Sequence, residues 1–405
     1  MTDDREDIDK QEESFSSLKA GKKEPKRNNT PKAGKRSRPA PTPKPEPKPE
    51  PTPKAKKEKP KKSKAEREKE MKRGLSIFAA AISAIFLFFV VINNLEPKKS
   101  VELNSFMVEK GELPMIGAHR GGAYNYPENT MLAFLSSVYD IGVGMIESDV
   151  HLTKDGYLVF NHDNYIDKTS NVNGDIPLED VLLICEDESR RHYISDMTLA
   201  ELESYNFGYY FENEFGDRVY KDVDDIAEAG LQIATVEKAF DAFYSDGSEI
   251  LFCIEIKDKG ELGYRSADIL RDLLLEYPDY ASRVVVSSYS DDIERYIREE
   301  YPFILRGAST GSAAGFIISN AIGLNYFDPS DFACLQIPLH LTEIVDIDMT
   351  LDFPALVDRA HKRNISVQYW TINDPDEMRL LIELGCDVIT TDNPQLLKEI
   401  LEEYR

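Results

Sequence analysis

Short apolar runs that alternate with amphipathic segments constrain the fold of this 405-residue chain more than any other feature. Helical patterns such as SADILRDLLLEY and DPDEMRLLIELG lie between most of the runs. Strands of this kind, separated by helices of about 10–15 residues, are typical of an α/β protein with a parallel sheet covered by helices. The runs are MIGAH (115–119), GMIESDV (144–150), YLVFNH (157–162), EILFCIEIK (249–257), RVVVSSY (283–289), FILRGAS (303–309), ACLQIPL (333–339), ISVQYWTI (365–372) and CDVITTD (386–392).

The number of these units predicts that the sheet closes on itself. Eight strand–helix units fit into residues 114–405, which favours a (β/α)8 TIM barrel over an open sheet. The first run is not followed by a Gly-rich dinucleotide-binding pattern, which argues against a doubly wound fold. Residues 164–230 interrupt the alternation with a polar stretch rich in Asp, Tyr and Asn. We expect this stretch to be an insertion above the barrel mouth, where loops carry specificity.

An uncharged stretch joins the predicted barrel to the N-terminal part of the chain. Residues 75–92, LSIFAAAISAIFLFFVVI, contain no charged side chain over 18 positions, which is long enough to cross a bilayer. No polar face interrupts the run, as a buried soluble helix would require. No small-x-small cleavage site follows it, which argues against a signal peptide. We therefore expect a single-pass transmembrane anchor, followed by a linker at 93–113.

Charge is distributed very unevenly on the two sides of this stretch. Residues 1–74 contain 24 Lys and Arg against 14 Asp and Glu, a net charge of +10. Because the whole chain has a net charge of −24, residues 75–405 carry a net charge of −34. By the positive-inside rule, the N-terminus lies in the cytoplasm and the barrel lies outside the cell membrane. The Lys/Pro-rich tail 1–74 cannot bury a core and is expected to be disordered. It either contacts anionic lipid or an acidic partner, or is only a solvated tail that sets the topology; no nucleic-acid partner is expected.

Four cysteines, Cys185, Cys253, Cys334 and Cys386, lie in the part of the chain predicted to be extracytoplasmic. Four cysteines allow three disulfide pairings, and the sequence does not choose among them. Cys253 and Cys386 lie within strand-like runs, where a buried thiol is the simpler interpretation. Because no CxxC spacing occurs, we expect no structural metal cluster.

Polar side chains gather at the C-terminal ends of the predicted strands, where barrels of this type carry their catalytic groups. Two carboxylates two residues apart on a strand point to the same side and repel unless a cation lies between them. Three carboxylates around one point form a hard-oxygen site suited to Mg²⁺ or Ca²⁺. The strand-end residues are His119, Arg120, Glu147, Asp149, His162, Asp163, Glu255, Lys257 and Trp370, and the predicted metal ligands are Glu147, Asp149 and Glu255.

Histidines and cations complete this predicted site. His119 and His162 follow separate strands, so that one can accept a proton while the other donates one. Arg120 and Lys257 can hold phosphate oxygens, or pair with the carboxylates, and the two roles are compatible. His151 shares the face of Glu147 and Asp149, but a rise of about 3.3 Å per residue places it roughly 13 Å from Glu147, too far to share one ion. We expect His151 to be a loop or surface histidine.

The segment PENT opens the first predicted helix, because Pro127 suits a first helical turn. We expect Glu128 and its neighbour Asn129 to contact the site residues rather than the substrate, with Glu128 orienting either Arg120 or His119.

The motifs GAHRG, YPENT, IESDVHLTKDG, FNHD, IEIK, QYWTIND and ITTDNP, in this order across residues 114–405, resemble the glycerophosphodiester phosphodiesterase family. The resemblance implies a TIM barrel that uses one divalent metal ion to cleave glycerophosphodiesters into an alcohol and glycerol 3-phosphate. It implies that Glu147, Asp149 and Glu255 are the metal ligands. Lys168, where the family usually has Arg, and ATVEKAF, in place of a P-T-L-E run, are small departures from the family pattern.

The resemblance also implies roles for the remaining strand-end residues. His119 and His162 would be the general base and the general acid, without an assignment of which is which. The glycerol hydroxyl would attack first, and water would open the resulting cyclic phosphate. Trp370, the single tryptophan, would form an apolar wall beside the glycerol, or would only pack in the core.

Three other functions stay open at this point. The substrate could be a lysolipid or a glycerol-phosphate polymer of the cell envelope, or the enzyme could act as a phospholipase C or D on intact lipid. The third alternative is a catalytically idle barrel that displays a binding surface. The acidic barrel would not steer anions from a distance, so local charge from the metal, Arg120 and Lys257 would dominate substrate binding.

Overall fold

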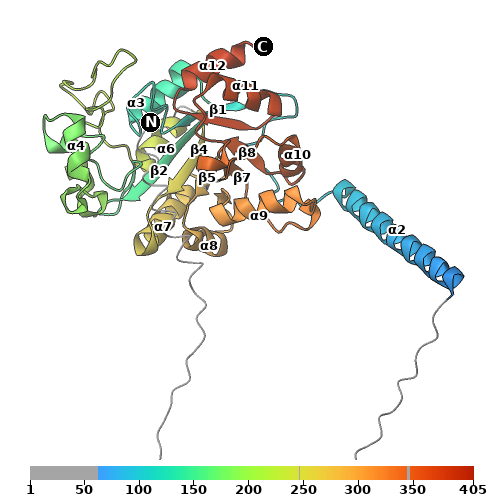
Figure 1. Cartoon of the computed structure of the whole chain (residues 1–405). Helices are drawn as coiled ribbons and strands as arrows, with labels where there is room; N and C mark the ends of the chain where they lie inside the picture. The colour runs from blue at the N-terminus through green and yellow to red at the C-terminus, as the bar shows by residue number, and fades with distance from the viewer. Residues whose placement is uncertain (1–62, 246, 344–346) are drawn as a thin grey trace, which may run out of the picture. The chain divides into compact units, whose positions relative to one another are not determined.

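The computed structural model describes residues 63–245, 247–343 and 347–405, and the chain divides into two units between Leu87 and Phe88. The second unit contains eight parallel strands in the order β6-β5-β4-β2-β1-β9-β8-β7. A parallel bridge between Gly307 and Cys334 joins the two ends of this order, and Ala333 N donates to Arg306 O at 2.8 Å. The predicted TIM barrel is therefore confirmed (Figure 1). The strands are β1 (Met115–His119), β2 (Met145–Leu152), β4 (Leu251–Ile256), β5 (Val284–Ser287), β6 (Leu305–Arg306), β7 (Cys334–Ile337), β8 (Ser366–Tyr369) and β9 (Val388–Thr391).

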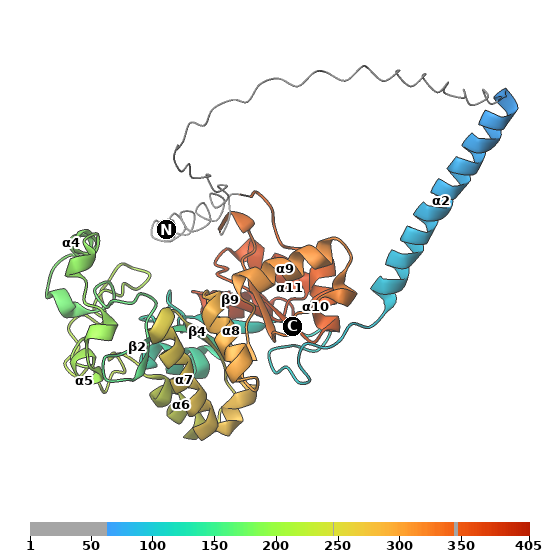
Figure 2. The same cartoon turned by 90° about the horizontal axis from the view of Figure 1, so that it is seen from below.

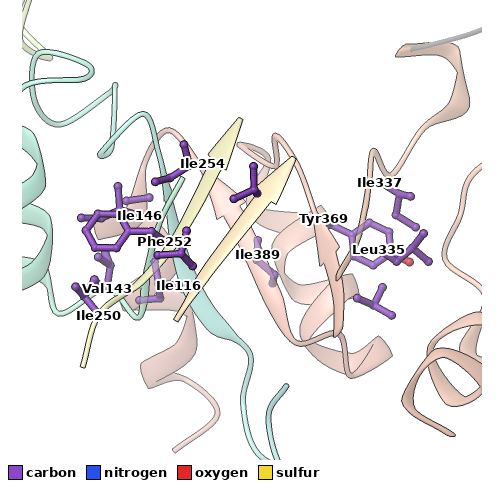
Figure 3. Close-up of a cluster of buried hydrophobic side chains, with 14 of the residues drawn as sticks. Ile116, Val143, Ile146, Ile250, Phe252, Ile254, Leu335, Ile337, Tyr369 and Ile389 are labelled. Atoms are coloured by element: carbon purple, nitrogen blue, oxygen red, sulfur yellow. The ribbon is translucent and has the colours of Figure 1, made fainter. Parts of the chain in front are cut away.

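Amphipathic helices cover the outside of the barrel, each following a strand as the sequence pattern predicts. Their apolar faces pack on the strands in one large core, and Figure 3 shows part of it, including Ile116, Ile146 and Phe252. The helices are α3 (Met131–Ser136), α6 (Val236–Ser245), α7 (Gly260–Glu276), α8 (Asp291–Glu300), α9 (Thr310–Ala321), α10 (Pro354–Lys362), α11 (Pro375–Leu384) and α12 (Pro394–Glu402).

The third apolar run forms a strand that does not belong to the barrel. This strand, β3 (Leu158–Phe160), pairs antiparallel with the end of β2, with Val150 opposite Phe160. A turn at Gly156, whose φ is +96°, reverses the chain, and glycine adopts this backbone conformation without the penalty of a side chain. The hairpin extends β2 beyond the level of its neighbours and returns the chain to the barrel mouth at His162.

The segment 164–230 contains the short helices α4 (Leu178–Cys185) and α5 (Leu199–Leu202), and it lies beside the β2–β3 hairpin (Figure 2). It buries a small apolar cluster of its own, in which Ile166, Ile194 and Phe207 pack with Val159 of β3. The polar composition of this segment therefore conceals a local core that the sequence pattern did not indicate.

All four cysteines are buried free thiols. Cys253 and Cys334 lie inside the barrel, and Gln336 Nε2 donates to Cys253 Sγ at 2.8 Å. The question of which disulfide pairing forms is thereby answered, because none of the three is present.

The N-terminal helix α2 (Lys64–Asn94) is longer than the predicted span 75–92. Residues 64–74 were expected to be disordered and are helical, so this part of the prediction is wrong. Ser63 and Glu66 form a reciprocal N-terminal cap, and Glu68 pairs with Lys72 at 2.8 Å, so the charged turns are good helix formers. The rest of the predicted tail, 1–62, lies outside the described residues. By length and composition, α2 could cross a membrane.

Candidate active site

Three carboxylates meet at the C-terminal end of the barrel. Glu147 and Asp149 come from β2 and Glu255 from β4, where Asp149 and Glu255 are direct register partners. One oxygen of each lies within 4.8 Å of the others. Asp149 Oδ2 and Glu255 Oε1 are buried and accept no hydrogen bond from the part of the chain that is described. Leaving buried oxygens without a partner is costly, so the three residues fit a hard divalent cation, as predicted for them.

Burial and neighbouring charges shift the pKa values of two of these carboxylates in opposite directions. Burial raises the pKa of Glu255 to about 8, and repulsion from Asp149 and Glu147 adds to the rise while Lys257 opposes it. Lys257 Nζ lies 3.3 Å from Asp149 Oδ1 and 3.6 Å from Glu255 Oε1. Although burial acts in the other direction, Lys257 and His162 lower the pKa of Asp149. The cluster therefore holds one firmly ionised carboxylate beside one that stays ionised at neutral pH only with more positive charge nearby.

His119, the last residue of β1, is held by a carboxylate from the far end of the chain. Its Nδ1 lies 2.6 Å from Asp392 Oδ1, and its Nε2 lies 3.8 Å from Glu147 Oε2. Asn373 Nδ2 donates to the other oxygen of Asp392 at 2.7 Å. Burial and Arg120 lower the pKa of His119, but Asp392 and Glu147 outweigh them and raise it. Asp392 was missed as a site residue, although it ends the last strand-like run and lies in the motif ITTDNP.

His162 has a similar arrangement after β3. Its Nδ1 lies 3.2 Å from Asp163 Oδ1, and Lys168 Nζ lies 3.2 Å from the other oxygen of Asp163. His162 is close enough to Asp149 to lower the pKa of that carboxyl. Both predicted histidines thus lie at the mouth beside the carboxylates, and each has its Nδ1 beside an aspartate.

Arg120 follows His119 in a left-handed backbone conformation with φ of +51°. Its Nη1 donates to Glu128 Oε2 at 3.2 Å, and its Nε lies 4.0 Å from Asp149 Oδ2. Asn129 Nδ2 donates to Glu128 Oε1 at 3.4 Å, and Ser148 Oγ donates to Asn129 Oδ1. Glu128 was expected to orient either Arg120 or His119, and in the structure it contacts Arg120.

Two aromatic residues lie near these groups. Trp370 directly follows β8 and is only partly buried, whereas a tryptophan within the core would be covered. Tyr289, which follows β5, was not singled out in the sequence. Lys257 Nζ lies 5.0 Å from the centre of its ring, a cation–π contact that fixes the ammonium group beside the carboxylates.

His151 is not the loop or surface histidine that we expected. It lies within β2 and is 4% exposed, because the β3 hairpin prolongs this strand beyond the mouth. Its Nδ1 lies 2.7 Å from Asp258 Oδ1, and its Nε2 lies 3.2 Å from the carbonyl oxygen of His162. Asp258 also accepts from Leu152 N at 2.8 Å. His151 therefore joins β2 to the loops after β3 and β4 rather than binding an ion.

We expect His151→Ala to lower the free energy of unfolding by about 2–3 kcal/mol, because it leaves a cavity in place of a buried imidazole and also removes the partner of Asp258. The full chain in detergent can be unfolded with denaturant and followed by the fluorescence of Trp370, the single tryptophan. His192→Ala is the matched control, since it also removes the imidazole partner of a buried carboxylate, Asp167 at 2.8 Å, but His192 itself is 42% exposed and its removal leaves no enclosed cavity. Equal losses for the two variants would contradict the role of burial.

Comparisons with known proteins agree with this geometry. A family model described as the glycerophosphoryl diester phosphodiesterase family matches residues 119–396. A glycerophosphodiester phosphodiesterase from Caldanaerobacter subterraneus subsp. tengcongensis is 27% identical over 295 residues, which cover 71% of this chain and 98% of that protein. A lysophospholipase D from Rattus norvegicus is 26% identical, over 70% of this chain and 85% of its own length.

Solved structures show the same fold. The crystal structure of a glycerophosphoryl diester phosphodiesterase from Silicibacter pomeroyi superposes with a TM-score of 0.54 at 18% identity, covering 74% of this chain and 96% of that one. A phosphodiesterase from Oleispira antarctica, solved with the product sn-glycerol-3-phosphate, gives a TM-score of 0.50 at 22% identity, over 72% of this chain and 97% of that one.

Proposed function

The chain belongs to the glycerophosphoryl diester phosphodiesterase family, and on this premise we propose that it hydrolyses glycerophosphodiesters to glycerol 3-phosphate and an alcohol with one divalent cation. The observation that carries the proposal is the carboxylate cluster at the mouth, with two buried oxygens that accept no hydrogen bond from the described residues. Two histidines and two cations lie beside it. This combination suits a phosphate diester, which needs both proton transfer and charge neutralisation.

The charge of the substrate would be neutralised by two kinds of group, a metal ion and basic side chains. A divalent cation, Mg²⁺ or Ca²⁺, held by Glu147, Asp149 and Glu255 would supply positive charge to a phosphoryl oxygen. Arg120 and Lys257 would add fixed positive charge, and both already pair with the site carboxylates. Their two expected roles are therefore compatible in one arrangement.

The histidines would move the protons. One removes the proton from the glycerol hydroxyl as its oxygen attacks phosphorus, and the other gives a proton to the oxygen of the departing alcohol. Water then opens the cyclic phosphate with the proton transfers reversed. Asp392 and Asp163 occupy the Nδ1 side of His119 and His162, which leaves each Nε2 to exchange protons with the substrate.

A second candidate is a phospholipase D-like cleavage of lysolipids, which the printed name of the rat relative favours. We also propose that α2 anchors the chain through residues 75–92, with the basic tail in the cytoplasm against anionic lipid and residues 114–405 outside. The two candidate reactions release the same alcohol and differ in whether the glycerol carries an acyl chain, so the phosphate-bearing product, glycerol 3-phosphate or lysophosphatidic acid, separates them.

Removal of divalent cations with a chelator is expected to abolish hydrolysis of glycerophosphocholine by the full chain, and Mg²⁺ or Ca²⁺ should restore it. Without a cation the three carboxylates repel one another and also repel the phosphate, so the substrate should not bind. The products are resolved by chromatography: glycerol 3-phosphate with choline supports the proposal, whereas phosphocholine indicates a different bond cleaved. An unchanged rate in chelator would refute the dependence on metal.

A further inference from the structure

The predicted linker 93–113 is bound to one end of the barrel. Ser100 N donates to Arg363 O at 2.7 Å, and Asn104 Nδ2 donates to Ala333 O at 2.8 Å and to Asn364 O at 2.9 Å. Ala333 directly precedes β7, and Asn364 lies two residues before β8. These contacts are therefore made at the N-terminal ends of the strands, the end of the barrel opposite to the site carboxylates.

The same segment closes this end of the barrel. Val108 N donates to Asp387 Oδ1 at 3.0 Å, directly before β9. Phe106 is fully buried and packs with Met145 and Val388, the first residues of β2 and β9. The chain therefore enters the barrel unit across its N-terminal face, and the mouth with the site is on the other face.

The last turns of α2 contact the N-terminal face as well. Asn93 Nδ2 donates to Gly323 O at 3.2 Å, and Arg359 Nη2 donates to Asn93 Oδ1 at 3.1 Å. The ring of Phe88 stacks on that of Phe327, with the centroids 6.5 Å apart. Gly323 and Phe327 follow the C-terminal end of α9 and lead towards β7, so they also lie on this face.

Apolar side chains are exposed next to these contacts. Ile318 and Ile322 lie one turn apart at the end of α9 and are 61% and 55% exposed, and Tyr326 and Phe327 follow them. We call these four residues the α9 surface. It is continuous with Phe88 through the stacked ring of Phe327, and Phe88 belongs to the uncharged run of α2.

We propose that the α9 surface lies against the lipid surface from which α2 emerges. Exposed aliphatic and aromatic side chains are the groups that enter the boundary between headgroups and acyl chains. The contacts of Asn93 hold the end of the apolar helix beside this surface, so a bilayer that accepts α2 meets the α9 surface too. A second copy of the chain would not explain why the surface continues into a candidate membrane span.

The consequence concerns the substrate and rests on the proposed function. With its N-terminal face on the bilayer, the barrel opens its mouth to water on the far side. The enzyme then takes water-soluble glycerophosphodiesters, rather than lysolipids held in the bilayer that anchors it. Turnover of dissolved glycerophosphocholine should exceed that of lysophosphatidylcholine placed in the same vesicles by at least severalfold, and equal rates would overturn this conclusion.

The surface itself is tested by fluorescence quenching. Ile318→Cys and Leu183→Cys of the full chain are labelled with a thiol-reactive fluorophore and reconstituted into phosphatidylcholine vesicles that contain nitroxide-labelled lipid. Both positions are 61% exposed, and the native cysteines are buried. Leu183 lies in α4, within the segment that follows the β2–β3 hairpin, and so reports on the other candidate for membrane contact. We expect the label at 318 to be quenched several times more strongly than the label at 183.

Equal quenching, or stronger quenching at 183, would overturn the proposed orientation. Energy transfer between labels at 318 without quenching by lipid would overturn it in favour of self-association. Hydrolysis of glycerophosphocholine by both labelled variants reports separately on the proposed function. Quenching at 318 without turnover would refute that function and leave the surface in place, whereas turnover with equal quenching would do the reverse.

Discussion

Replacement of Glu255 by Gln is expected to lower the turnover of glycerophosphodiesters about a thousandfold, a loss of about 4 kcal/mol of transition-state stabilisation. Gln keeps the shape of the side chain but removes one negative charge from the cluster of three carboxylates. It also puts an amide where Oε1 now lies without a hydrogen-bond partner among the described residues. The affinity for Mg²⁺ or Ca²⁺, measured by calorimetry, should fall together with turnover.

The same substitution should not lower the thermal stability of the chain when no cation is bound. Burial raises the pKa of Glu255 to about 8, which means that the fold works against the ionised carboxylate. The neutral Gln is free of that cost, so thermal unfolding in chelator should occur at the same temperature or above that of the unsubstituted chain. Glu261→Gln, at an exposed position in the first turn of α7, is the matched control and should keep full activity. An active Glu255→Gln variant would remove Glu255 from the site.

The sequence could predict those parts of the site that depend on strand periodicity. Glu147 and Asp149 face the same side because they are two apart on one strand, and Glu255 had to arrive at the same end because the strands are parallel. Each of the nine apolar runs contains a strand for the same reason. Periodicity, however, gives the face of a residue and not the residue that lies opposite it.

The parts that could not be predicted depend on contacts made only when the barrel closes. Asp392 is 273 residues from His119 and reaches it only because β9 pairs with β1. His151 was misplaced because nothing in its own strand shows that β3 folds back and covers it. Phe106 lies in the short stretch NSFMVE, which has no strand or helix periodicity, and it is buried because the ends of several strands surround it.

Replacement of either histidine proposed to transfer protons is expected to lower kcat about 10²–10⁴-fold, and the choice of leaving group should tell the two apart. A general acid matters most when the departing alcohol is a poor leaving group, and it is dispensable when the leaving group is p-nitrophenolate. The variant among His119→Ala and His162→Ala that regains most of its rate on a p-nitrophenyl diester has therefore lost the acid. His192→Ala, whose side chain is half-exposed and pairs with Asp167, should leave both rates unchanged.

The carboxylate of Asp392, beside His119, gives a second test of this assignment. Asp392 lies 2.6 Å from Nδ1 of His119. Burial acts to raise the pKa of Asp392, but the hydrogen bond with that imidazole outweighs it, and the pKa is lowered to about 2. Asp392→Asn keeps the shape but removes the charge that favours the protonated His119, so it should slow the reaction less than His119→Ala. Its response to the leaving group should be the same as that of His119→Ala. If His119 is the acid, p-nitrophenyl diesters rescue both variants; if it is the base, they rescue neither, and His162→Ala recovers instead. A site in which both histidines matter equally for both leaving groups would contradict a division of labour, and the proton transfers would then have to be assigned to other groups at the mouth.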